Sequence, residues 1–154
     1  MKKLILIACF ALGTLTQAQN ITMVDGLYKE DGKLYTGPVT SYNENGAKKS
    51  EAYAKDGLLE GKVIYFYDNG RIMEEGTYTA GLKAGLWTRF NNAGIKIGEA
   101  GYDHGKKNGT WMVYDDNGQK RFQMSYKDGE KTGTWLQWDE RGEVIKSTAY
   151  NTMN

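Results

Sequence analysis

The fold is decided by one 24-residue stretch, residues 109–132, which reads GTWMVYDDNGQKRFQMSYKDGEKT. Residues 109–114 carry the aromatic and β-branched side chains that are enriched in strands. Residues 115–118, Asp-Asp-Asn-Gly, predict a hairpin turn, because Asn and Gly tolerate positive φ angles. Residues 119–126 return as a second strand, and residues 127–132 turn the chain again. The stretch therefore predicts one β-hairpin and its connection to the next.

The same pattern recurs every 24 residues along most of the chain, and a fixed period of this length indicates a repeat architecture. Only the step from Gly32 to Gly57 differs, at 25 residues. We expect an all-β fold, an elongated antiparallel meander of five hairpins. The equivalent positions are the opening glycines Gly37, Gly61, Gly85, Gly109 and Gly133; the first-turn glycines Gly46, Gly70, Gly94, Gly118 and Gly142; the second-turn glycines Gly57, Gly81, Gly105 and Gly129; and the tyrosines Tyr78, Tyr102, Tyr126 and Tyr150.

Each repeat also carries two large side chains at fixed places, two and five residues after its opening glycine. These offsets differ by an odd number, so the two sets are expected on opposite faces of the sheet. The residues just before the tyrosines are mostly small, which leaves room for a neighbouring ring. Stacked repeats would bury the rings. The first set is Val39, Val63, Trp87, Trp111 and Trp135, and the second is Tyr42, Phe66, Phe90, Tyr114 and Trp138.

The recurring pattern, Gly-x-Trp-x-x-Tyr/Phe-x-x-x-Gly followed by Tyr and then by x-Gly-x-x-x-Gly, resembles the MORN repeat. It is most similar to the 24-residue MORN variant of the bacterial YwqK-family antitoxins. The opening segments, residues 34–39 (LYTGPV) and 42–46 (YNENG), are similar to first repeats of that family. The resemblance covers about residues 28–150, and it implies a toxin-neutralising protein.

The first eighteen residues are typical of a secretory signal peptide. A basic start, Met1–Lys3, precedes the apolar run Leu4–Leu15, which is too short to span a bilayer. Small residues then precede a cleavage site between Ala18 and Gln19. We therefore expect a signal peptide at 1–18, a cap or partial repeat at 19–36 and the repeat domain at 37–154. The protein would be exported to the periplasm, outer envelope or medium of a bacterium.

An alternative interpretation of the same segment is a lipoprotein signal, with acylation of Cys9 in the sequence Leu6-Ile7-Ala8-Cys9. The apolar run continues past Cys9 through Leu12, which favours cleavage after Ala18. Cys9 is the single cysteine of the chain, so neither a disulfide framework nor a cysteine-based zinc site is available.

The composition excludes several function classes. The 20 Lys and Arg residues nearly balance the 19 Asp and Glu residues, so there is no electrostatic case for nucleic acid as the main partner. His104, the one histidine, lies where other repeats have a turn aspartate. The acidic turns lack the spacing of a calcium loop. The carboxylate pairs Glu74-Glu75 and Asp139-Glu140 are expected to be solvated, so we expect no catalytic residue, metal or cofactor.

These patterns predict a non-catalytic protein that binds another protein, which the family resemblance specifies as a toxin. The alternative is an envelope module that binds glycan or acts as a scaffold, with sugar rings stacked on Trp87, Trp111, Trp135 and Trp138. The fixed repeat position of the first three tryptophans favours a core role for them.

Overall fold

The computed structural model describes residues 5–8 and 19–150, and within these residues it contains strands and turns but no helix. The part of the chain that it describes therefore has no helix that could cross a membrane. The strands are β1 (Ile5–Ala8), β2 (Gln19–Val24), β3 (Leu27–Glu30), β4 (Lys33–Leu34), β5 (Gly37–Tyr42), β6 (Lys48–Lys55), β7 (Leu58–Leu59), β8 (Gly61–Phe66), β9 (Ile72–Thr79), β10 (Leu82–Phe90), β11 (Lys96–Asp103), β12 (Lys106–Tyr114), β13 (Lys120–Lys127), β14 (Glu130–Trp138) and β15 (Val144–Tyr150).

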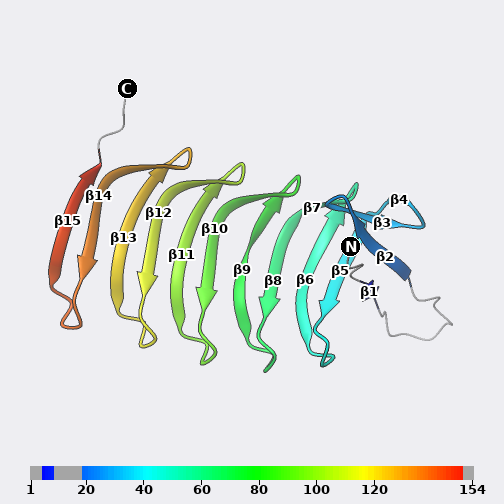
Figure 1. Ribbon diagram of the computed structural model, residues 1–154, viewed down its shortest axis with the longest axis horizontal. Coiled ribbons are helices and arrows are strands. Elements are labelled where there is room, and N and C mark those ends of the chain that lie inside the picture. Colours follow the sequence, from blue (N-terminus) through cyan, green and yellow to red (C-terminus); the bar gives the residue numbers. More distant parts are fainter. Residues whose placement is uncertain (1–4, 9–18, 151–154) are drawn as a thin grey trace.

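The repeats form one antiparallel meander in the order β15-β14-β13-β12-β11-β10-β9-β8-β6-β5, with the short β7 paired to β6 (Figure 1). Five hairpins lie side by side in chain order: β5–β6, β8–β9, β10–β11, β12–β13 and β14–β15. The predicted all-β meander of five hairpin repeats is confirmed.

The connection from one hairpin to the next is tighter than the sequence pattern predicts. Asp128 and Gly129 both have positive φ, 53° and 94°, as a two-residue hairpin turn of mirror-image type requires. Pairing resumes at once, with Lys127 opposite Glu130. The prediction that residues 127–132 all belong to the turn is therefore wrong, because β14 already begins at Glu130.

The opening glycine of each later repeat lies inside a strand and bends it. Gly85 has a φ of 65°, and the pairing of β10 with β9 shifts register between Ala84 and Thr88. The first residues of β10, β12 and β14 consequently curve away from the rest of the strand at the upper edge of the sheet (Figure 1). This bend places Lys83 and its equivalents above the face of the sheet.

The turns at the opposite edge are hydrogen-bonded to one another across the first four repeats. Asn43 donates to Asp68 Oδ1 at 2.6 Å, and Asn69 donates to Asn92 Oδ1 at 2.6 Å. The series continues where Asn91 donates to the backbone carbonyl of Asp116 at 3.1 Å. These four repeats are thus tied to one another through side chains as well as through the sheet.

A second sheet, in the order β1-β2-β3-β4, packs at the start of the meander. Ile21 and Tyr28 of this sheet, with Tyr35 just after β4, form a buried cluster with Val39 and Ala54 of the first repeat. The backbone continues the repeat pattern, since Gly57 N–H donates to the carbonyl of Tyr35 just as Gly81 does to Leu59 and Gly105 to Lys83. Residues 19–36 therefore cover the first end of the core.

The predicted signal peptide lies partly outside the described residues. Ile5–Ala8 form β1, which pairs antiparallel with β2 from Ile5 opposite Thr22 to Ala8 opposite Gln19. Cys9 and Ala18, on which the two processing alternatives depend, are not among the described residues. Cleavage after Ala18 would remove β1 and leave β2 at the edge of the second sheet.

Candidate functional site

One face of the meander carries a continuous row of alternating tyrosine and tryptophan rings, which we call the aromatic ladder. Neighbouring ring centroids lie 4.6 to 6.2 Å apart, with interplanar angles of 50° to 87°. Such tilted and edge-on contacts are favoured over face-to-face stacking. The ladder consists of Tyr78, Trp87, Tyr102, Trp111, Tyr126, Trp135 and Tyr150.

Each ladder tryptophan is held in place by its indole N–H. Trp87 donates to the carbonyl of Thr77 at 3.2 Å, Trp111 to Gly101 at 2.9 Å and Trp135 to Ser125 at 3.1 Å. Burial is uneven, because Trp87 is 1% exposed whereas Trp111 and Trp135 are only half-buried. Trp87 is therefore a core residue, and the later two tryptophans also contribute to the surface.

The small residues next to the ladder have a steric cause. A Cβ at Gly76 would overlap the indole of Trp87, with even the third-nearest ring atom, Cγ, at 2.6 Å. A Cβ at Gly101 would overlap the carbonyl of Asn108. Both positions need glycine because a ring or a backbone segment occupies the space of a side chain.

A row of lysines covers the ladder. The Lys83 ammonium lies 3.6 Å from the Trp87 ring centroid and also pairs with Glu74 at 3.3 Å. Lys107 lies 4.3 Å from the centroid of Trp111, and Lys131 lies 4.7 Å from that of Trp135. These are cation–π distances, and the apolar stems of the lysines shield the rings. The sequence analysis missed this row, although 24-residue spacing relates Lys83, Lys107 and Lys131.

The second set of aromatic residues lies on the other face. Tyr114 donates to Glu99 Oε2 at 2.8 Å. Glu99 lies opposite Met112 in the sheet, and Met112 follows Trp111 in its strand, so Met112 and Glu99 both point away from the ladder face. Lys96 donates to Glu99 at 2.8 Å and lowers its pKa, while burial and Glu99 raise the pKa of Tyr114. Phe66, Phe90, Tyr114 and Trp138 are half-buried, and Tyr42 is exposed.

Two hollows open beside the ladder. The middle hollow has a volume of about 400 Å³ and lies where Gly98 leaves space between Trp87 and Trp111. Glu74 and Arg89 also line it. The end hollow, about 330 Å³, has a more apolar lining, and its Phe122 is 39% exposed. The end hollow is lined on this face by Phe122, Met124, Trp135, Gln137, Lys146 and Tyr150.

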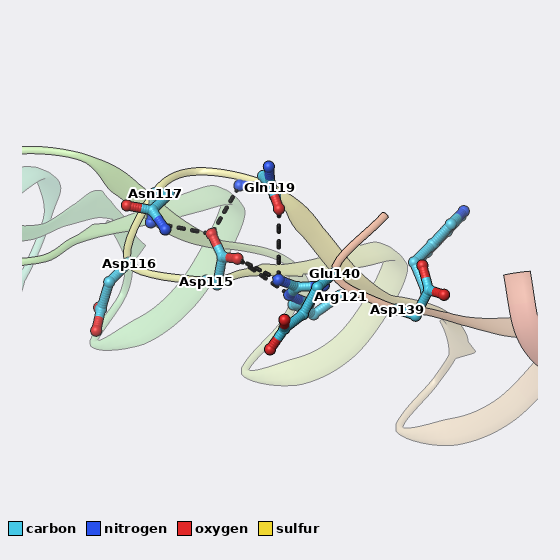
Figure 2. Close-up of a pocket in the computed structure, with 8 residues that line it drawn as sticks. Asp115, Asp116, Asn117, Gln119, Arg121, Asp139 and Glu140 are labelled. Carbon is cyan, nitrogen blue, oxygen red and sulfur yellow. Dashed lines mark hydrogen bonds and ion pairs between the residues drawn. The ribbon is translucent and has the colours of Figure 1, made fainter. Parts of the chain in front are cut away.

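A third hollow, the turn hollow of about 780 Å³, lies between the turns of the fourth and fifth repeats (Figure 2). Asp115 uses one carboxylate oxygen to accept from the backbone N–H groups of Asn117 and Gln119, both at 2.9 Å, and the other to pair with Arg121 at 2.6 Å. The Gln119 N–H, with a further contribution from Arg121, lowers the pKa of Asp115. Trp138 completes the lining together with Asp116, Asp139 and Glu140.

The remaining sequence candidates do not come together as a reactive site. His104 is exposed in a turn with a φ of 46°, and its Nδ1 lies 2.7 Å from Asp103. Glu74 pairs with Lys83, whereas Glu75 pairs with Lys62 at 2.9 Å. No group of three His, Cys, Asp or Glu residues could hold a metal ion in the part of the chain that the structure describes.

The MORN repeat variant family matches residues 59–80 and 107–128, which cover the hairpins β8–β9 and β12–β13. The chain therefore carries MORN repeats of this variant at these two places. The two matches are 48 residues apart, which is two repeats, so they fall on equivalent parts of the MORN repeats.

Other comparisons add little to this. No curated protein sequence matches the chain. A solved structure titled "Crystal structure of GtfA/B complex bound to UDP and GlcNAc" shares 10% identity, covering 76% of this MORN-repeat chain and 23% of that chain, with a TM-score of 0.31. The chain thus spans less than a quarter of that protein, and a likeness at this TM-score carries no argument.

Proposed function

We propose that this MORN-repeat protein is a non-catalytic module that binds another protein through the face that carries the aromatic ladder. The observation that carries the proposal is the end hollow, where a large apolar side chain, Phe122, is 39% exposed beside half-buried Trp135. Exposed apolar patches with a polar rim are typical of protein interfaces. Aromatic side chains at such a place would supply most of the binding energy.

The dimensions of the sheet suit this role. Adjacent strands lie about 4.8 Å apart, so ten strands extend roughly 45–50 Å. A specific interface buries about 800 Å² on each partner. Three or four repeats of one face would supply such an area.

The family resemblance specifies the partner of the proposed module as a toxin, so that binding would cover the working surface of that toxin. The predicted signal peptide places the encounter outside the cytoplasm. Intact mass of the protein from its own cells tests the export: we expect a chain that begins at Gln19. A chain that retains residues 1–18, or one that carries an acyl group on Cys9, would contradict it.

A glycan-binding envelope module is the second candidate. Sugar stacking needs a free ring face, and the lysines above Trp87, Trp111 and Trp135 make those rings poor platforms. Trp138 favours the glycan hypothesis, since it lines the turn hollow together with carboxylates, Gln119 and Arg121.

The test is affinity purification with the full chain as bait, followed by titration of the protein that co-purifies. We expect Phe122→Asp to weaken binding at least tenfold and Thr110→Asp to leave it within twofold, because Thr110 is exposed on the opposite face. Saturable binding of cell-wall glycan that Trp138→Ala abolishes, with no protein partner, would favour the second candidate instead.

A further inference from the structure

We propose that the end hollow receives an acidic peptide segment of the partner protein, with an apolar side chain in the hollow and carboxylates on the lysines around it. This inference rests on the proposed function and adds the chemistry of the partner. It follows from the way in which charge changes along the ladder face.

The apolar part of the site is built from rings that are already ordered. The ring centroids of Trp135 and Tyr150 lie 4.6 Å apart, and the indole N–H of Trp135 donates a hydrogen bond to the Ser125 carbonyl. Phe122 stands beside them and remains 39% exposed. A hollow of about 330 Å³ between these side chains admits one large apolar side chain without rearrangement of the ladder.

The charge around the hollow is positive and uncompensated. Lys131 lies 4.7 Å from the Trp135 ring centroid and 5.1 Å from that of Tyr150, and Lys146 lines the hollow itself. No acidic residue is in the lining. Among the described residues, neither these two lysines nor Lys107, which lies above Trp111 and Tyr126, forms an ion pair.

One position in the repeat explains why this occurs only at the end hollow. Residue 74 is a glutamate, and it pairs with Lys83 above the ladder. The equivalent residues at 24-residue steps are Gly98, Phe122 and Lys146. The acid that neutralises the lysine row in an early repeat is thus replaced first by glycine, then by an apolar side chain and then by a second base.

An acidic peptide supplies what is missing. Lys107 and Lys131 are one repeat apart, or about 9.6 Å along the array. Carboxylates at that spacing would pair with both ammonium groups through charge-assisted hydrogen bonds. A basic segment would be repelled, which gives the site selectivity by charge.

The test uses a phage-displayed library of random twelve-residue peptides, selected on the full-length chain. We expect enriched peptides in which Asp or Glu flank Leu, Phe or Trp. A synthetic copy of the strongest binder, measured by fluorescence anisotropy, should lose at least tenfold affinity for the double variant Lys131→Glu/Lys146→Glu. The control Lys106→Glu/Lys120→Glu changes two exposed lysines outside both ladder hollows and should stay within twofold.

Three results would overturn the inference. They are the absence of any enriched peptide, enriched peptides without an excess of Asp and Glu, or a synthetic peptide that binds the Lys131→Glu/Lys146→Glu variant as tightly as the wild type. Binding of phosphatidylglycerol vesicles that this variant loses, without peptide binding, would assign the lysines to a lipid surface. A co-purified protein that binds the variant as tightly as the wild type would refute the acidic segment and leave the proposed function intact. Absence of any protein partner would refute the proposed function itself.

Discussion

Substitution of Gly76 by alanine should destabilise the protein strongly, because the added methyl group meets the most buried ring of the aromatic ladder. The new Cβ would overlap the Trp87 indole, whose Cγ would be 2.6 Å away and two other ring atoms closer still. Carbon atoms prefer separations of about 3.5–4.0 Å, so the ring would have to move by more than about 1 Å. Trp87 is 1% exposed and its ring centroid lies 5.1 Å from that of Tyr78, so a shift of the indole would disturb packing that is already close.

The expected loss of unfolding free energy in Gly76→Ala has two contributions. Overpacking of a well-packed core costs about 1–3 kcal/mol. A shift of the indole also weakens its hydrogen bond to the Thr77 carbonyl, which contributes about 1 kcal/mol. We therefore expect Gly76→Ala to lower the free energy of unfolding by about 2–4 kcal/mol, which corresponds to a fall in Tm of roughly 4–16 °C for a chain of this size.

The chain offers a matched control. Gly98 is also inside a strand on the ladder face, but the nearest atom to a Cβ there, Arg89 Cβ, would be 3.7 Å away. Gly98→Ala should leave stability unchanged or raise it by up to about 1 kcal/mol, because glycine is unfavourable within a strand. Thermal and urea unfolding followed by far-UV circular dichroism measure both variants. Equal midpoints for the two variants would refute the placement of Trp87 against Gly76.

Three further outcomes are expected. Trp87→Ala should cost about 3–5 kcal/mol in urea unfolding, as for other buried aromatic residues, and half-buried Trp111→Ala should cost less; the reverse order would contradict the burial of the ladder. Deletion of residues 85–108, one whole repeat, should preserve the circular dichroism spectrum, whereas a twelve-residue deletion from the same start should not, because it joins mismatched strands; similar melting of the two would contradict the repeat register. Glu99→Gln should destabilise the protein at pH 7 and lose this effect in acid. The pKa of Glu99 lies below its usual 4.5 in the folded state, since Lys96 donates to it, so its contribution is complete above that value and disappears as the pH falls through the folded pKa. A gap between wild type and variant that does not narrow as the pH falls below 4.5 would contradict this assignment.

The hairpin repeats could be predicted from sequence because their determinants are local. Asp-Gly and Asn-Gly turns specify where the chain reverses, and the period of 24 residues then assigns every strand to a neighbour. The point at which a strand resumes was harder to predict. Glu130–Thr132 look like turn residues by composition, yet the two-residue turn at Asp128-Gly129 is so tight that they are already paired.

The ladder face shows a second limit. The ring positions follow from spacing, but the lysines that cover them do not, because their placement depends on the strand bend at glycines such as Gly85. Pairs such as Lys106-Lys107 look like solvated dipeptides in the sequence. Alternation across the bent strand instead sends Lys107 over the rings. Tertiary geometry, and not composition, decides this feature.

The uneven burial of the ladder gives the array a direction of melting. Val39, Val63 and Trp87 are 1–2% exposed, whereas Trp111 and Trp135 are half-buried. In an array where each unit contacts only its neighbours, local opening begins where the least area is buried and spreads from there. Amide protons of β14 and β15 should therefore exchange with solvent before those of β8 and β9. A molecule seated over the last rings would complete their burial, so recognition at that end would also slow the first step of unfolding.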